Sequence, residues 1–174
     1  MIVLQIVGYK NAGKTTLATA AISRLSGLGY SVGAVKRDAH DFEPDVPGTD
    51  SYRHRQAGAY MTAITSDSRT AWTIERPNEL DELLANMRVN GVEVAIVEGF
   101  KTAPHPKLVL LRDEADIELL RLSNIVAVGL REPNERLVAA AARADLPIFD
   151  IGDKQLDELL IYISSIIAAA IHET

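Results

Sequence analysis

The sequence predicts an α/β protein in which a mixed, mostly parallel sheet is flanked by helices in three layers, α/β/α. Short apolar runs typical of strands alternate along the chain with stretches of helical periodicity. Several of these runs are apolar over four or more consecutive positions, as strands covered on both faces are. With 174 residues and 47% hydrophobic content, the chain is long and apolar enough for one domain, residues 1–174, with its own core.

Eight apolar runs are candidate strands: IVLQIV, SVGAVK, YMTAIT, TAWTIE, VEVAIV, KLVLLR, NIVAVGL and LPIFDI. The third and fourth runs are joined by a short stretch that contains SDS, which favours a turn. This spacing predicts a β-hairpin over residues 60–75. Because a hairpin is antiparallel, we expect the sheet to be mixed.

Apolar side chains at intervals of three and four residues predict helices over residues 16–28, 78–89, 134–144 and 154–172. In the first of these, Gly27 and Gly29 supply the stop. The last helix has one apolar stripe, but Ile161 and Tyr162 lie off it. These two side chains and the open strand edge of the hairpin favour a homodimer.

Charge and composition exclude several function classes. A net charge of -6 and a pI near 5.2 argue against a nucleic-acid binder, which needs a basic face. The absence of cysteine excludes disulfides and thiolate metal sites. The first ten residues lack the features of a signal peptide, and the longest apolar stretch, residues 159–171, is shorter than the roughly 20 residues of a membrane span. We therefore expect a soluble, cytoplasmic protein that binds neither nucleic acid nor membrane.

The stretch GYKNAGKTT matches a phosphate-binding pattern. Gly8, Gly13, Lys14 and Thr15 satisfy G-x-x-x-x-G-K-[ST], between a predicted strand and a predicted helix. The glycines let successive backbone N–H groups point inward, and the helix adds its positive dipole end. In this P-loop, Lys14 is expected to bridge the β- and γ-phosphates, Thr15 to bind Mg²⁺ and Thr16 to reach the α-phosphate. The intervening Asn11 and Ala12 supply further backbone to the nucleotide cradle.

Glu98 is the predicted carboxylate partner of the metal. It ends the apolar run VEVAIVEGF, at the edge where open α/β sheets bind ligands, and Gly99 lets the chain turn away. Mg²⁺ prefers oxygen ligands, which Glu98 supplies directly or through water. The alternative is an ordinary strand-end acid that faces solvent.

Residues 36–59 form a charged stretch, rich in turn formers, that begins at the same edge of the sheet. One interpretation is a mobile segment that orders over a bound ligand, with inward-pointing side chains at Lys36, Arg37, His40 and Asp50. The other is a solvated loop followed by a helix capped by Thr49 or Asp50. The residues alone leave both open.

Three stretches together, GYKNAGKTTL, VKRDAHDFEPDVPGTDSYRHRQAGA and VEGFKTAPHPK, resemble the B protein family of molybdopterin-guanine dinucleotide biosynthesis, MobB. The EGFK strand end and the G-x-D-S to A-G spacing make the resemblance specific. It implies a cytoplasmic, usually dimeric accessory protein that binds GTP with Mg²⁺, hydrolyses it weakly, and assists a molybdopterin guanylyltransferase, with molybdopterin itself as a further ligand. It also implies a catalytic role for Lys14 and Glu98, metal binding by Thr15 and Glu98, and a nucleotide or cofactor contact at Asp50.

Two departures from other P-loop proteins bear on activity. The stretch NIVAVGLREPN offers Leu130 and Arg131 where many P-loop GTPases have Asn-Lys-x-Asp. The expectation that the nucleotide is GTP and not ATP therefore rests on the resemblance alone. EGFKTAPHP contains neither the Gln nor the Arg that commonly speeds hydrolysis, which predicts slow turnover unless Arg37 or Arg53 acts as a finger. A P-loop kinase that phosphorylates a small molecule, with Asp38 or Asp41 as base, is the alternative function.

Overall fold

The computed structural model describes residues 1–38, 40–143, 145–152 and 155–172. Contacts along the chain divide it into two compact units, Met1–Arg37 with Leu80–Thr174, and Asp38–Glu79. We call them the main unit and the inserted unit. The organisation as a single domain stays a prediction.

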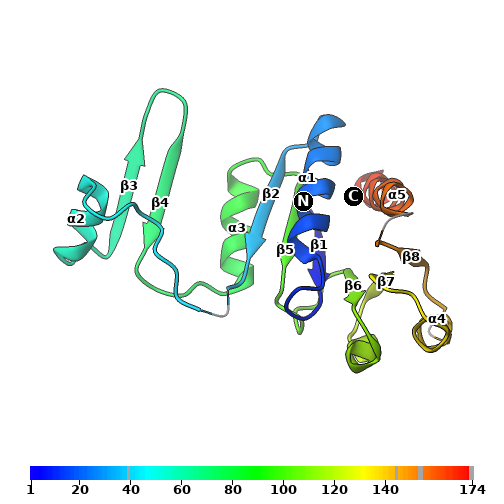
Figure 1. Ribbon diagram of the computed structural model, residues 1–174. Helices are drawn as coiled ribbons and strands as arrows, with labels where there is room; N and C mark the ends of the chain where they lie inside the picture. The colour runs from blue at the N-terminus through cyan, green and yellow to red at the C-terminus, as the bar shows by residue number, and fades with distance from the viewer. Residues whose placement is uncertain (39, 144, 153–154, 173–174) are drawn as a thin grey trace. The chain divides into compact units, whose positions relative to one another are not determined.

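The main unit is built on a parallel sheet. Six described strands follow one another in the order β2-β5-β1-β6-β7-β8 (Figure 1), and each pairs with its neighbours in parallel. Their bounds are β1 Ile2–Val7, β2 Val32–Lys36, β5 Val94–Glu98, β6 Lys107–Leu111, β7 Ile125–Leu130 and β8 Ile148–Asp150. Every residue of β5 and β6 is buried, including the charged Glu98 and Lys107 at the strand ends, and the apolar stretches VAIV and LVLL predict this burial.

Helices cover both faces of this sheet, which confirms the predicted three layers. On one face, strand residues such as Ile6 and Ile96 pack with α1 (Lys14–Gly27) and α5 (Leu156–His172). On the other face, α3 (Leu80–Val89), the 3₁₀ helix η1 (Glu114–Arg121) and α4 (Glu135–Ala142) cover the alternate strand residues. The alternation follows from the two-residue period of a strand.

The inserted unit contains the predicted hairpin, formed by β3 (Met61–Thr65) and β4 (Thr70–Ile74). These two strands form a separate antiparallel sheet, so the prediction of one mixed sheet is wrong. A sequence reveals which strands share a tight turn, but not which sheet they join. The preceding helix, α2 (Asp50–Gln56), has Thr49 as its N-cap, one of the two caps that the sequence predicts.

The predicted elements agree with the structure to within two residues at the ends that lie among the described residues. The predicted end of the third helix at Ala144 and start of the fourth at Lys154 lie outside those residues. The helix η1 is missing from the prediction because 3₁₀ helices lack the 3.6-residue period. Among the described helices, none is both long and apolar enough to cross a membrane.

Candidate phosphate-binding site

The loop between β1 and α1 has the backbone geometry that its glycines predict. Gly13 is the N-cap of α1 with φ +89°, and it offers no side chain to the first-turn amides. Asn11 also has positive φ, +65°. A Cβ on Gly8 would lie 3.0 Å from both Ala12 Cβ and the carbonyl oxygen of Leu110, so the tight turn there favours glycine. The loop therefore presents backbone rather than side chains at the start of a 14-residue helix.

Lys14 is held across this loop. Its Nζ donates to the carbonyl oxygen of Tyr9 at 2.8 Å, and the amide of Ala12 donates to the same oxygen at 3.2 Å. Burial lowers the pKa of Lys14 below the usual lysine value, and the positive charges of Lys101, Lys36 and Arg112 lower it further, against the opposing effect of Glu98. An anion bound beside Lys14 would relieve this repulsion.

Thr15 and Glu98 come together as predicted. The Thr15 hydroxyl donates to Glu98 Oε2 at 2.9 Å, and Glu98 is buried, with 9% of its surface exposed. Glu98 therefore faces the loop rather than solvent, unlike the strand-end acid of the alternative interpretation. A hydroxyl and a carboxylate oxygen side by side are the donor types that Mg²⁺ prefers, so these residues fit the metal that the P-loop implies. Bound there, Mg²⁺ would neutralise charge on phosphate oxygens.

The turn after β5 keeps Glu98 in place. Gly99 has φ +92°, consistent with the abrupt change of direction that its sequence predicts. The buried Gln5 side chain donates from Nε2 to the carbonyl oxygens of Gly99 at 3.0 Å and Phe100 at 2.8 Å. We did not predict this role of Gln5 from the sequence. A polar residue within the otherwise apolar run IVLQIV was the one feature that could have indicated it.

Two cations predicted to lie at the ligand edge of the sheet do so. Lys36 is the register partner of Glu98, and the Arg37 amide donates to the Glu98 carbonyl oxygen at 3.1 Å. The guanidinium of Arg37 lies 5.3 Å from the centroid of the Phe100 ring. Lys101 Nζ lies 3.6 Å from the centroid of the Tyr9 ring. These cations give the sheet edge beside Glu98 a positive character suited to phosphate.

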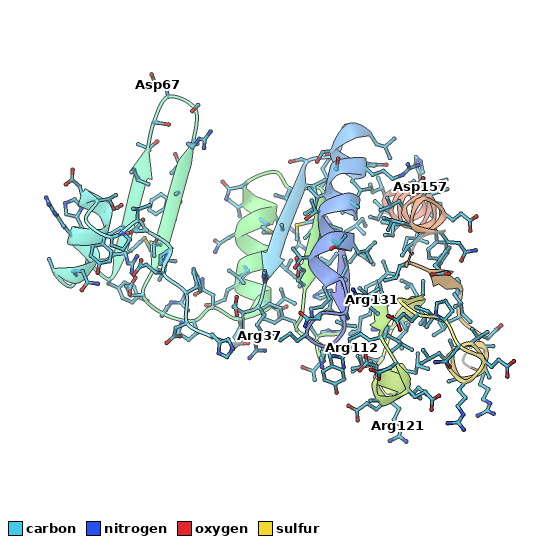
Figure 2. All side chains as sticks on the ribbon, viewed as in Figure 1. Arg37, Asp67, Arg112, Arg121, Arg131 and Asp157 are labelled. Atoms are coloured by element: carbon cyan, nitrogen blue, oxygen red, sulfur yellow. The ribbon has the colours of Figure 1, made fainter. Side chains whose placement is uncertain are left out.

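Two arginines that sequence reasoning did not assign to the site hold the outer side of the loop (Figure 2). Arg112 follows β6 and donates from Nη1 to the carbonyl oxygen of Lys10 at 3.0 Å. Arg131 follows β7 and donates from Nη1 to the carbonyl oxygen of Asn11 at 2.5 Å. Each arginine comes directly after a buried strand, at the ligand edge of the sheet. This position in the sequence could have indicated that they belong to the site.

Arg112 is itself fixed by a carboxylate. It donates to Asp116 from Nε at 2.8 Å and from Nη2 at 2.7 Å, and Asp116 is fully buried. The guanidinium lowers the pKa of the Asp116 carboxyl. Tyr9, on the loop, donates its hydroxyl to Glu118 of η1. The 3₁₀ helix thus holds one side of the loop.

A cavity of about 210 Å³ lies beside the start of α1. Its walls include Ala12, Thr16 and Leu17 on one side and Arg131, Ile151 and Gly152 on the other. The cavity therefore adjoins the phosphate-binding backbone.

The remaining predicted residues lie in the inserted unit. Asp50 is in the first turn of α2, with its side chain 90% exposed and 3.7 Å from Arg53 Nη1. His40 and Asp41 are also exposed. The roles predicted for Asp50, for Asp38 or Asp41 as a base, and for Arg53 as a finger stay predictions.

A parallel sheet whose first strand runs through this loop into a helix, with Glu98 on the neighbouring strand, defines a P-loop protein. Residues 3–130 match the model of the family described as molybdopterin guanine dinucleotide synthesis protein B. The chain belongs to this family, MobB, which confirms the resemblance of its motifs.

Curated relatives agree with this assignment. The chain is 34% identical over 157 residues to the molybdopterin-guanine dinucleotide biosynthesis adapter protein of Escherichia coli, which covers 86% of this chain and 85% of that protein. It is 31% identical over 153 residues to the probable adapter protein of the same name in Bacillus subtilis, which covers 87% and 86%.

Solved structures agree in fold. The crystal structure of a MobB protein homolog from Bacillus stearothermophilus has a TM-score of 0.76 and 32% identity, over 97% of this chain and 99% of that chain. Bacillus subtilis MobB has a TM-score of 0.74 and 30% identity, over 92% and 96%.

Proposed function

We propose that this protein is a GTP-binding adapter of molybdopterin-guanine dinucleotide biosynthesis that hydrolyses GTP slowly with Mg²⁺. It acts with a molybdopterin guanylyltransferase, with molybdopterin as a further ligand, and works as a homodimer in the cytoplasm. The names of its curated relatives support the pathway, since one is named an adapter protein of molybdopterin-guanine dinucleotide biosynthesis and the other a probable one.

The observation that carries the nucleotide site is the hydrogen bond of 2.9 Å from Thr15 to Glu98, at the start of the helix that Gly13 caps without a side chain. The free first-turn amides and the helix dipole favour phosphate oxygens. Lys14, held over the loop by the Tyr9 carbonyl oxygen, supplies a full charge to the β- and γ-phosphates. Thr15 and Glu98 hold Mg²⁺, the first directly and the second directly or through water.

Slow hydrolysis follows from what surrounds the γ-phosphate position. The turn after Glu98 supplies Lys101 but neither the Gln nor the Arg that orients water in faster P-loop enzymes. Arg37 directly follows β2, the strand that pairs with β5, and its guanidinium lies 5.3 Å from the centroid of the Phe100 ring. A partner protein would then complete the site or read its nucleotide state.

Calorimetric titration with GTP, ATP and GDP, each with and without Mg²⁺, tests the proposal. We expect Mg²⁺-dependent binding of GTP that is tighter than that of ATP, and phosphate release at a low rate. Equal affinity for ATP would overturn the nucleotide assignment. Stoichiometric appearance of a phosphorylated small molecule with nucleotide loss would identify a kinase instead.

A further inference from the structure

One buried side chain fixes the direction of the peptide groups that come just after Glu98. Gln5 of β1 donates to the carbonyl oxygens of Gly99 and Phe100. Both peptide groups are trans, and the C=O and N–H of a trans peptide point in opposite directions. The amides of Phe100 and Lys101 belong to the same two peptide groups, and they are therefore directed away from Gln5.

These two amides are free among the residues that the structure describes. Neither the Phe100 N–H nor the Lys101 N–H donates to a protein group there. Phe100 also has a φ of +51°, a left-handed conformation that a residue with a large side chain rarely adopts. The hydrogen bond from Gln5 to its carbonyl oxygen helps to hold that conformation. Unpartnered N–H groups on a constrained turn are suited to binding an anion.

Lys107 holds the second half of the same loop. Its side chain is fully buried, and its Nζ donates to the carbonyl oxygens of Ala103 at 2.5 Å and His105 at 2.9 Å. Burial lowers the pKa of Lys107, and no acid among the described residues forms an ion pair with it. A buried ammonium without a counter-ion is costly, and an apolar side chain would avoid that cost. The position of Lys107 therefore indicates a role other than stabilising the core.

Lys101 connects this turn with the phosphate-binding loop. Its Nζ lies 3.6 Å from the centroid of the Tyr9 ring, and the carbonyl oxygen of Tyr9 accepts from Lys14 at 2.8 Å. Burial lowers the pKa of Lys14, and the positive charge of Lys101 lowers it further. Glu98, which the turn follows, accepts from Thr15. The turn is therefore next to both the lysine and the carboxylate of the phosphate site.

We propose that the turn after Glu98 binds the γ-phosphate of the nucleotide, through the amides of Phe100 and Lys101 and through the Lys101 ammonium. Gln5 and Lys107 are positioning residues, which do not touch the nucleotide but hold the turn in this conformation before it binds. The inference rests on the proposed function, because only a triphosphate in the loop brings a γ-phosphate to the turn. GTP is then distinguished from GDP by an anion site that is already formed.

Calorimetry with GTP and GDP, each with Mg²⁺, tests the contact with the γ-phosphate. Lys101→Ala should weaken GTP binding about tenfold, as expected for a lost hydrogen bond to a charged group, and leave GDP binding unchanged. Arg88→Ala, at an exposed position of α3, removes the same charge elsewhere and should bind both nucleotides as the parent does. In the parent, GTP but not GDP should slow hydrogen exchange at the amides of Phe100 and Lys101.

Two further variants test the positioning role. Gln5→Met and Lys107→Met preserve the approximate length of each side chain and remove its donors to the loop. Each should reduce the preference for GTP over GDP about tenfold, and GTP should no longer slow exchange at the two amides. The affinity for GDP shows that a variant is folded, since the phosphate loop binds GDP without the turn. A purely structural role would change the affinities for both nucleotides together.

Other outcomes overturn the inference. Equal affinity of the parent for GTP and GDP, or an equal effect of Lys101→Ala on both, would mean that the turn does not bind the γ-phosphate, although the phosphate site stands. Methionine variants that bind GDP normally and keep the full preference for GTP would show that Gln5 and Lys107 only support the fold. If neither of them folds, Lys101→Ala and the exchange of the two amides in the parent decide. A parent that binds neither nucleotide would overturn the proposed function as well.

Discussion

The main unit and the inserted unit differ in how they are stabilised. All the residues classed as buried among those that the structure describes belong to the main unit, where the parallel sheet lies between two layers of helices. The inserted unit has none, and it exposes large apolar side chains: Phe42, Val46, Tyr60, Met61, Ile64 and Trp72. The main unit therefore has an apolar core, and the described residues of the inserted unit form none.

In the inserted unit, ion pairs of one arginine connect segments that no apolar core joins among the described residues. The Arg55 side chain, only 8% exposed, makes ion pairs with Glu43 at 2.6 Å, Asp45 at 3.1 Å and Glu75 at 2.7 Å. It thereby fastens the stretch before α2 to the end of the hairpin. Two-stranded hairpins are marginally stable alone, and exposed apolar patches mark interaction surfaces. From this contrast we expect the main unit to bind the nucleotide, and the exposed apolar side chains of the inserted unit to pack against another protein surface.

The largest effect is expected at the loop of the main unit. Lys14→Ala should weaken Mg²⁺-dependent GTP binding by roughly 3 kcal/mol or more, because it removes the full charge closest to the β- and γ-phosphates. Lys10→Ala, at an exposed position of the same loop, is the control and should bind GTP normally. Calorimetry measures both, and unchanged affinity of the Lys14 variant would refute the P-loop assignment.

The next effect concerns the stability of the main unit. Asp116→Asn should lower the free energy of unfolding by about 2 kcal/mol, because it leaves Arg112 without its buried carboxylate partner. Glu43→Gln, at a 41% exposed partner of Arg55, should have a much smaller effect. Urea unfolding measures the free energy of unfolding of both variants. If the two substitutions lower it equally, the two units do not differ in how strongly their ion pairs stabilise them.

The Asp116 pair also predicts a pH dependence. Because Arg112 lowers the pKa of Asp116 in the folded state, the stabilisation is fully present above the ordinary pKa of Asp. It is lost as the pH falls through the lowered, folded-state value. The difference in stability between the parent and Asp116→Asn should therefore shrink in acid, and a difference that is constant from neutral to strongly acidic pH would contradict the assignment.

A smaller effect is expected at Glu98. Glu98→Gln keeps the shape of a side chain that accepts from Thr15, so the fold should survive, while GTP affinity at limiting Mg²⁺ falls by about 1 kcal/mol. Titration of Mg²⁺ at fixed GTP measures this. If the variant matches the parent at every Mg²⁺ concentration, Glu98 is structural.

The sequence predicted some parts of the candidate site and not others. The phosphate loop is a local motif, and Glu98 was placed correctly because a single buried strand positions it. Arg112 and Arg131 contact loop carbonyls 102 and 120 residues away in sequence, and such pairs depend on strand order, which periodicity does not reveal. Tyr162 also shows the limit: predicted off the apolar stripe and available to a partner, it instead packs against Phe149 and donates to the Val126 carbonyl oxygen.

The exposed apolar surface of the inserted unit predicts the homodimer. Trp72 is 66% exposed on β4, and Thr65 and Thr70 close the far end of the hairpin. We expect light scattering to show a dimer at micromolar concentration, and Trp72→Thr to shift it toward monomer. Leu28→Thr, at a 57% exposed apolar position in the main unit, is the control and should leave the dimer intact. Only monomer in the parent would contradict the prediction.

The smallest effect is expected in the inserted unit when nucleotide binds. If residues 40–51 are a solvated connector, their exposed backbone should exchange quickly in every state. If they serve the nucleotide site, GTP with Mg²⁺ should slow their hydrogen exchange more than GDP does, because the γ-phosphate is the group that such segments detect. Asp50→Ala removes an exposed carboxylate at the start of α2 and should reduce support of molybdopterin guanylylation more than it reduces GTP binding. Glu132→Ala, an exposed acid of the main unit, is the matched control. Equal exchange in all nucleotide states, together with full activity of Asp50→Ala, would make this segment a connector and leave the ligand chemistry to the main unit alone.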